Sequence, residues 1–514
     1  MRSSPASLPL FPASPGTEEE SARPELPLPS APLRKQLWLC LDFHRLPLEI
    51  FSDSDHSRAF AVLEGEGGGL RICQCNDRAT RDGLHPELPL NAALALSPAP
   101  EMRERAPGRE AETLNRLAAW ACQFTDMVSI EPPHRLLLEI RGSLKLFGGL
   151  AALCRQACAG VTDMGYTSVL AVAPTPRSAL WLCNHRQGEI VTEAALLPDR
   201  LSELPLACTD WSQSIREQLN AMGVLTIGDC LRLPREGFAR RLGPQRLREL
   251  DAALGRCAET RHRFVVPPVY HGELELLAET LDHERLCRAM ARLVEEMQGF
   301  LRSWQKGVQR PVFGFVHGDG RQRLALGLAE PSADAAFLLD LLAERLESYR
   351  LEQPVTDLVL DSGLLADLPG SPRGLFADTE GAGRDAAAGR RLVDRLRARL
   401  GRDAVNGVCL LAEHRPEAAW KFVEPGAGCG RAGNPGRPFW ILQDPRELSC
   451  REGRPWLEGV LEIIEGPERI ETGWWDGRDA ARDYYVARNL TGVRVWIYQE
   501  RRSPEQWFLH GVFG

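Results

Sequence analysis

Three short apolar runs near the start of the chain constrain its fold most strongly. Leu37–Leu41 is apolar throughout and ends at Asp42, Leu136–Ile140 is apolar except for Glu139, and Ser168–Ala173 is apolar after its first residue. Short runs without polar alternation are typical of strands buried on both faces. The segment from about Gly149 to Met164, between the second and third runs, has the period of a helix. These features predict a mixed sheet with crossover helices.

Length and composition indicate several domains. At 514 residues the chain is too long for one hydrophobic core. With 44% hydrophobic and 26% charged residues it reads as a soluble globular protein. No apolar run approaches the roughly 20 residues of a membrane span. The first 35 residues are rich in Pro, Ser and Glu and are expected to be disordered. The 14 scattered cysteines indicate a reducing cytoplasm.

Residues 215–255 have a helical period with short turns marked by glycine. Around Met222–Asp229 we expect a helix end, a tight turn at Gly223 and a new helix capped by Thr226. This is typical of a helix-hairpin-helix, in which Gly223 and Gly228 would let the backbone approach a DNA phosphate. The same turn also joins packed helices in proteins that never bind DNA, so both interpretations stay open.

The charge distribution allows only a local contact with nucleic acid. A net charge of -8 gives no overall field that would attract DNA. Between Arg235 and Arg263, however, eight arginines stand against four acids, a net of 8 - 4 = +4. A patch facing phosphates is one interpretation and a solvated helix face is the other. The candidate DNA-binding cations are Arg240, Arg241, Arg246 and Arg248.

The second half of the chain alternates regular and irregular segments. Residues 264–361 predict the order βαββαβ, a compact split-βαβ domain with one free sheet face. A linker rich in Gly, Ala and Asp is expected over Ser362–Gly389, followed by a helix over Arg390–Leu400 and a short strand near Val408–Leu411. A second gap rich in glycine, Glu424–Gly436, precedes a module dense in aromatic residues.

These features resemble a known family. The strand ending in Asp42, the segment LLLEIRGSLKLFGG (136–149), the strand SVLAVAPT (168–175), the helix-hairpin-helix and the βαββαβ unit follow the order of palm, thumb and little finger in Y-family DNA polymerases. The motifs GPERIETGWWDG (466–477), RDYYV (482–486) and WFLHGVFG (507–514) look like the C-terminal region of ImuB-type proteins, which are non-catalytic relatives of those polymerases.

The resemblance implies an α+β multidomain fold. Its parts would be a tail (1–35), a palm and fingers (36–195), a helix-hairpin-helix thumb (196–260), a little finger (261–361), a linker (362–389), a helical connector (390–435) and a small C-terminal module (436–514).

The residues at the implied catalytic positions have the wrong charge for catalysis. A polymerase palm holds two divalent ions with three carboxylates, one from the first strand and two from an adjacent Asp-Glu pair. By resemblance Asp42 matches the first acid. Glu139 matches a further acid of the family, which lies five residues after the Asp of the pair and four residues after the Glu. The pair itself then falls on His134 and Arg135, which would repel Mg²⁺. We therefore expect no metal, no cofactor and no catalysis.

The alternative is an active Y-family polymerase that uses Mg²⁺ with Asp42, Glu139 and Glu131. Glu131 precedes Pro132–Pro133, which predicts an extended turn rather than a position on a strand.

The implied nucleotide-binding positions have also changed. A Tyr and an Arg that grip the triphosphate in the family correspond here to Asp77 and Thr80, before Gly83-Leu84. The Asn-Lys pair after the third palm strand corresponds to Thr175-Pro176. An Asp in place of a triphosphate-binding side chain opposes a polyanion.

By resemblance, the partners would be DNA, a sliding clamp, an ImuA-type protein similar to RecA, and an error-prone C-family DNA polymerase. These would act together in damage-induced (SOS) mutagenesis, in the cytoplasm and on the nucleoid, with no membrane. Leu375-Phe376 supplies the hydrophobic plug of a clamp-binding peptide without its usual Gln, or is simply part of a linker. Aromatic residues of the C-terminal module form either a β-rich core or a partner-binding surface. The candidate partner-binding residues are Trp474, Trp475, Tyr484 and Tyr485.

Overall fold

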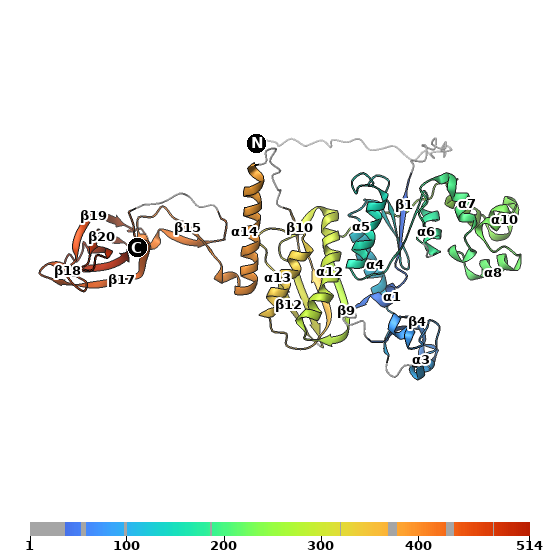
Figure 1. The fold of residues 1–514 in the computed structure, drawn as a ribbon, viewed down its shortest axis with the longest axis horizontal. Helices are drawn as coiled ribbons and strands as arrows, with labels where there is room; N and C mark the ends of the chain where they lie inside the picture. The colour runs from blue at the N-terminus through green and yellow to red at the C-terminus, as the bar shows by residue number, and fades with distance from the viewer. Residues whose placement is uncertain are drawn as a thin grey trace, which may run out of the picture. The chain divides into compact units, whose positions relative to one another are not determined.

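The computed structural model describes residues 36–52, 58–96, 100–185, 188–318, 320–368, 378–427, 436–475, 477 and 479–513. Contacts divide the chain into two compact units, which Figure 1 shows coloured by residue number. The first unit comprises Met1–Asp42, Leu137–Ala152 and Val169–His262, and the second comprises Phe43–Leu136, Leu153–Ser168 and Arg263–Gly514. None of the helices in these described ranges combines the length and apolar character needed to span a lipid bilayer.

The three predicted apolar runs are strands of one four-stranded sheet. Its order is β6 (Val128–Glu131), β7 (Arg135–Glu139), β1 (Trp38–Asp42) and β8 (Val169–Ala173). Strand β1 is buried at all five positions and runs antiparallel to β8, with Asp42 opposite Val169. The predicted helix is α5 (Leu150–Asp163), and α6 (Pro176–Asn184) follows β8.

Residues 58–104 contain a small sheet that the sequence reasoning missed. Strands β4 (Arg71–Cys75), β3 (Phe60–Glu64) and β5 (Glu101–Glu104) lie in that order, with α2 (Asp77–Arg81) and α3 (Leu90–Leu96). Only six described residues form its buried core, and three of them are alanines, so no strong apolar period marks it in the sequence. Before and after this sheet lie α1 (Leu46–Glu49), β2 (Phe51–Ser52) and α4 (Pro107–Ala121).

Residues 197–253 are helical, as the period predicts. The helices are α7 (Leu197–Ser202), α8 (Gln213–Ala221), α9 (Ile227–Arg232), α10 (Arg235–Leu242) and α11 (Pro244–Ala253). Gly223 has φ 77° between α8 and α9, and Gly243 has φ 91° between α10 and α11. Both are positive-φ conformations that glycine adopts without a steric cost.

The next region has the predicted βαββαβ order. Its elements are β9 (His271–Thr280), α12 (His283–Trp304), β11 (Val312–His317), β12 (Gly320–Ala325), α13 (Ala335–Glu347) and β13 (Val355–Asp361). The sheet order is β12-β11-β13-β9-β2, so β2 adds a fifth strand, parallel to β9. A two-stranded ladder joins β10 (Lys306–Val308) to β14 (Leu365–Asp367). The apolar face of α12 packs in the main core of this domain.

The predicted linker Ser362–Gly389 is partly wrong. Helix α14 (Asp378–Leu400) begins within it, because the alanines there favour a helix despite the intervening glycines. The hairpin of β15 (Gly407–Leu410) and β16 (Trp420–Val423) follows. The last sheet is ordered β18 (Arg454–Trp456), β17 (Trp440–Arg451), β22 (Trp507–Val512), β21 (Arg494–Glu500), β20 (Ala480–Arg488) and β19 (Glu462–Thr472).

One aromatic cluster of this last sheet surrounds a buried histidine. The Tyr484 and Trp496 rings stack with centroids 4.1 Å apart, and the Tyr484 hydroxyl lies 2.8 Å from His510 Nδ1. Burial lowers the pKa of His510 to about 4, so the ring is neutral at physiological pH. Tyr484 is therefore a residue of the module's interior.

Candidate functional site

The carboxylates of Asp42 and Glu139 lie at opposite ends of β1. Asp42 is the last residue of the strand and is buried. Glu139 Oε1 accepts hydrogen bonds from the backbone N–H groups of Leu37 (3.1 Å) and Arg141 (3.2 Å). Leu37 precedes Asp42 by five positions, which separates them by roughly 16 Å along an extended strand. Two catalytic ions sit only about 4 Å apart, so these two acids do not share such a site.

The positions that should carry the Asp-Glu pair begin strand β7. Arg135 is its first residue and is buried, while His134 is half-buried and its carbonyl oxygen accepts a hydrogen bond from Phe43 N (2.9 Å). A buried guanidinium raises the cost of placing a divalent cation nearby. Across the residues that the structure describes, no three His, Cys, Asp or Glu side chains form a group that could hold a metal ion.

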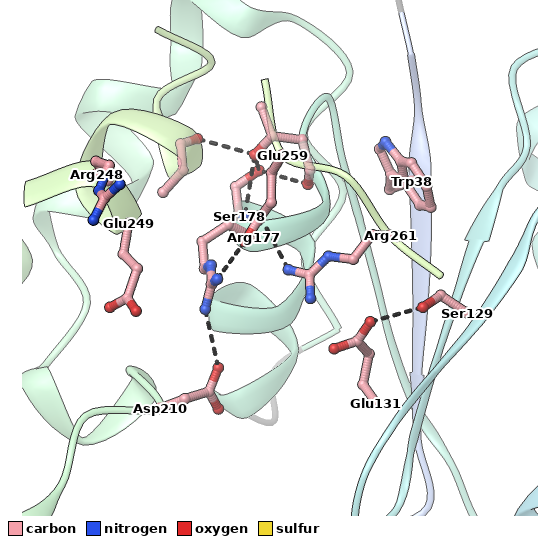
Figure 2. Close-up of polar contacts among 12 residues, drawn as sticks. Trp38, Ser129, Glu131, Arg177, Ser178, Asp210, Arg248, Glu249, Glu259 and Arg261 are labelled. Atoms are coloured by element: carbon pink, nitrogen blue, oxygen red, sulfur yellow. Dashed lines mark hydrogen bonds and ion pairs between the residues drawn. The ribbon is translucent and has the colours of Figure 1, made fainter. Parts of the chain in front are cut away.

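Glu131 lies on a strand, contrary to the sequence-based prediction. It is the last residue of β6, and Pro132 and Pro133 form the turn that follows. The Ser129 hydroxyl donates a hydrogen bond to Glu131 Oε1 at 3.0 Å, as Figure 2 shows. The error arose because a diproline also suits the turn of a hairpin, where the strand ends just before it.

The positions expected to bind the triphosphate belong to helix α2. Asp77 is highly exposed and lies 3.4 Å from the Arg45 guanidinium. The Thr80 hydroxyl donates to the backbone carbonyl of Asn76 at 3.1 Å, within the same helical turn. Neither side chain offers the positive charge that a triphosphate requires.

Thr175 performs a structural task at the start of α6. Its hydroxyl oxygen caps the helix by accepting a hydrogen bond from Ser178 N (3.1 Å), and it donates to the carbonyl of Ala253 (3.0 Å). The next residue on α6 after Pro176, Arg177, pairs with Glu259 and lies 3.8 Å from Asp210. Figure 2 shows this cluster, in which Glu259 also lies 3.0 Å from Arg261. The sequence reasoning missed this cluster because Arg177 and Glu259 are 82 residues apart in the chain.

The turn between α8 and α9 has the predicted cap, but its amides bond within the protein. Thr226 and Asp229 form a reciprocal capping box. Asp229 Oδ2 also accepts from the N–H groups of Leu225 and Thr226, both at 3.0 Å, and these bonds lower the pKa of the carboxyl group. Gly223 N donates to Asn220 O. The carboxylate of Asp229 thus takes the place that a phosphate would occupy at this turn.

Gly228 serves close packing between helices. A Cβ atom at this position would lie 2.7 Å from both the Cβ and the carbonyl oxygen of Ser202, at the end of α7. Helix–helix packing therefore accounts for a glycine at position 228, and its contact with a phosphate stays a prediction. At Gly223, by contrast, a Cβ would meet no atom within 4 Å.

The predicted basic patch retains three exposed arginines outside the ion pairs of this segment. Within the described part of the chain, Arg246 pairs with Glu249 at 2.8 Å and Arg235 pairs with Asp251 at 2.6 and 2.8 Å. Both acids are already counted in the net charge of this segment, so the pairs leave its net charge unchanged and occupy two of its arginines. The exposed arginines that form no such pair with a described residue are Arg240, Arg241 and Arg248, on α10 and α11.

The outer face of the five-stranded sheet is acidic along β9 and β13. Residues directly opposite in antiparallel strands share a face, and Asp357 pairs with Glu275, Val359 with Glu273, and Asp361 with His271. The same rows continue across β11 to Arg323 and Arg321 on β12. On these rows four acids stand beside two arginines, and Arg109 of α4 contacts Glu275 and Asp357, so the rows do not form a basic surface for a DNA backbone.

The C-terminal candidates separate by exposure. Trp474 is 80% exposed and Trp475 is 60% exposed, whereas Tyr484 is buried and Tyr485 half-buried. The two tryptophans are therefore available to a partner, while Tyr484 belongs to the core. The candidate clamp-binding residues Leu375 and Phe376 lie outside the described residues.

Comparison with known proteins identifies one clear relative. Protein ImuB of Caulobacter vibrioides, from strains NA1000/CB15N and CB 15, is 26% identical over 470 residues, covering 84% of this chain and all of ImuB. The chain is similar to ImuB. This similarity confirms the resemblance inferred from the C-terminal motifs. No protein-family model matches the sequence.

Among solved structures, a ternary complex of Dbh DNA polymerase is 15% identical with a TM-score of 0.38, covering 65% of this chain and 99% of that one. DinB from Sulfolobus solfataricus is 14% identical with a TM-score of 0.37, covering 65% of this chain and all of that one.

If the exposed arginines contact DNA, neutralising them reduces the salt dependence of binding. We expect Arg240→Gln, Arg241→Gln and Arg248→Gln together to weaken binding to duplex DNA. The slope of log K against log salt should fall by about 0.9 for each phosphate that an arginine no longer neutralises. Fluorescence anisotropy at several salt concentrations measures this slope.

The matched control is Arg235→Gln with Asp251→Asn, which removes a bonded pair without changing the net charge. An unchanged slope in the triple variant would contradict the assignment of these arginines to DNA.

Proposed function

We propose that this chain is a non-catalytic adaptor, similar to a Y-family polymerase, in DNA repair and damage-induced mutagenic translesion synthesis. One observation carries the proposal. A buried Arg135 and a half-buried His134 occupy the positions at which the resemblance implies two carboxylates, and Glu139 is held by backbone amides at the far end of β1.

The chemistry of nucleotide addition explains why this difference is decisive. Two divalent ions activate the primer hydroxyl and stabilise the leaving oxygen, and together they need several negative oxygen ligands. Asp42 alone supplies one such group. A guanidinium cannot coordinate Mg²⁺ and carries the same sign of charge, so the position opposes the ion instead of holding it.

The parts that bind would then account for the role of the chain. In this proposal, the four-stranded sheet and the small sheet of residues 58–104 are a palm and fingers, α7–α11 a thumb, and the βαββαβ unit a little finger. DNA would contact Arg240, Arg241 and Arg248, which are exposed. Leu375-Phe376 would bind a sliding clamp, and Trp474 and Trp475 would bind an ImuA-type protein or an error-prone C-family polymerase. Similarity to ImuB over 84% of the chain supports this assembly.

Primer extension tests the loss of catalysis. We expect the purified full-length protein to add no nucleotide to a primer-template with Mg²⁺ or Mn²⁺, because the ligands for two ions are missing. Asp42→Ala should behave as the unchanged protein does. Extension that disappears in Asp42→Ala would instead establish an active Y-family polymerase.

Clamp capture tests the adaptor role. We expect immobilised sliding clamp to retain the full-length protein, and the double variant Leu375→Ala, Phe376→Ala to pass through unbound, because two adjacent apolar side chains fill one pocket. Leu364→Ala with Leu368→Ala, which changes two exposed leucines in the residues just before this segment, is the control. Equal retention of both variants would contradict clamp binding through Leu375-Phe376.

A further inference from the structure

A tryptophan wedge joins three helices of the second compact unit. Trp120, on α4, lies against Gly160 of α5 and Gly299 of α12. A Cβ atom would lie 2.6 Å from the Trp120 ring at Gly160 and 2.0 Å from it at Gly299. Each helix therefore lacks a side chain where the indole enters. Helix α12 lies beside α4 (Figure 1). Ala119 of α4 belongs to the same apolar core as Leu293, Met297 and Phe300 of α12.

A buried carboxylate connects the same elements. Glu296 on α12 has no exposed surface. Its Oε1 accepts a hydrogen bond from the Tyr166 hydroxyl at 2.9 Å, and its Oε2 accepts from the Tyr270 hydroxyl at 3.1 Å and from Arg116 Nε at 2.8 Å. These donors come from the segment after α5, the segment before β9, and α4. Arg116 also donates to the hydroxyl of Thr113 at 3.1 Å, so the ion pair is extensively hydrogen-bonded.

Arg292, a cation on α12, binds backbone carbonyl groups of two segments that lie next to this helix. Arg292 Nε donates to the carbonyl of Met164 at 2.9 Å, and another of its nitrogens donates to the carbonyl of Glu49 at 2.6 Å. Its guanidinium carbon lies 4.7 Å from the centroid of the Tyr166 ring. Arg292 and Glu296, one turn apart on α12, thus bind residues of α1, of α4 and of the segment after α5, all far from α12 in the sequence.

We propose that these contacts form a lock, defined by Trp120, Gly299, Glu296, Arg116 and Arg292, that holds the βαββαβ domain on α4 and α5 in one orientation. A small slide of α12 would leave Glu296 and Arg116 buried without partners, which is strongly unfavourable. Complete separation would expose the buried side chains of Trp120 and Ala119 to water. Both free-energy costs oppose a rotation of the βαββαβ domain relative to α4 and α5.

The lock has a consequence for contacts with DNA. Because the domain keeps its orientation, the acidic rows of Glu273, Glu275, Asp357 and Asp361 also keep theirs relative to α4 and α5 when DNA binds. The lock is independent of the proposed adaptor role, since it would hold in an active polymerase as well.

The distance between two labels in the full-length protein tests the lock directly. Spin labels attached through unnatural amino acids at Gln156 on α5 and Glu347 on α13, both exposed, report on the orientation of the domain. We expect one narrow distance distribution from double electron–electron resonance, unchanged by primer-template DNA. A broad or two-component distribution in the unaltered protein, or a shift with DNA, would overturn the proposal.

Two variants identify the contacts responsible. Gly299→Ala forces a methyl group into Trp120, and Glu296→Gln places an amide nitrogen against hydrogen-bond donors, so both should broaden the distribution and lower the unfolding midpoint. The controls are Gly389→Ala, in open space on α14, and Glu295→Gln, a neighbour whose pKa burial already raises. The controls should keep the narrow distribution. If Gly299→Ala and Glu296→Gln both fold and keep it too, the lock is wrong.

Discussion

Two metal ions that share a catalytic pocket need carboxylates gathered within a few ångströms, and the strands around β1 decide whether this is possible. Asp42 ends β1, and Glu139 binds the amide of Leu37 at the other end of the same strand. Arg135 is buried at the first position of β7. The positions that the resemblance assigns to the catalytic Asp-Glu pair thus carry an imidazole and a guanidinium, and the proposed adaptor role depends on this difference.

Other candidate binding groups are used for the fold itself. Asp229 accepts from the turn amides that would face a phosphate, Gly228 packs against Ser202, and Thr175 caps α6. Such bonds stabilise the helical segment and leave its exposed arginines as the groups available to DNA. The charge of the five-stranded sheet points the same way, because its outer rows carry more carboxylates than guanidinium groups.

Sequence reasoning succeeded where one local signal dominates. The apolar run of β1 and the Thr226 cap each follow from a short stretch of residues, and each appears in the structure. It failed where the apolar pattern is weak and where the structure depends on contacts between residues far apart in the sequence. The sheet of residues 58–104 has a weak apolar pattern, Glu131 ends a strand before a diproline turn, and the network of Glu296 joins segments 130 and 180 residues apart.

Manganese binding tests the central claim most directly, because Mn²⁺ reports on the carboxylates without requiring DNA or nucleotide. Titration of the full-length protein with Mn²⁺, followed by electron paramagnetic resonance, should give no tightly bound ion whose signal depends on Asp42. Two bound ions per chain, both absent in Asp42→Ala, would contradict the account and indicate a working metal pair.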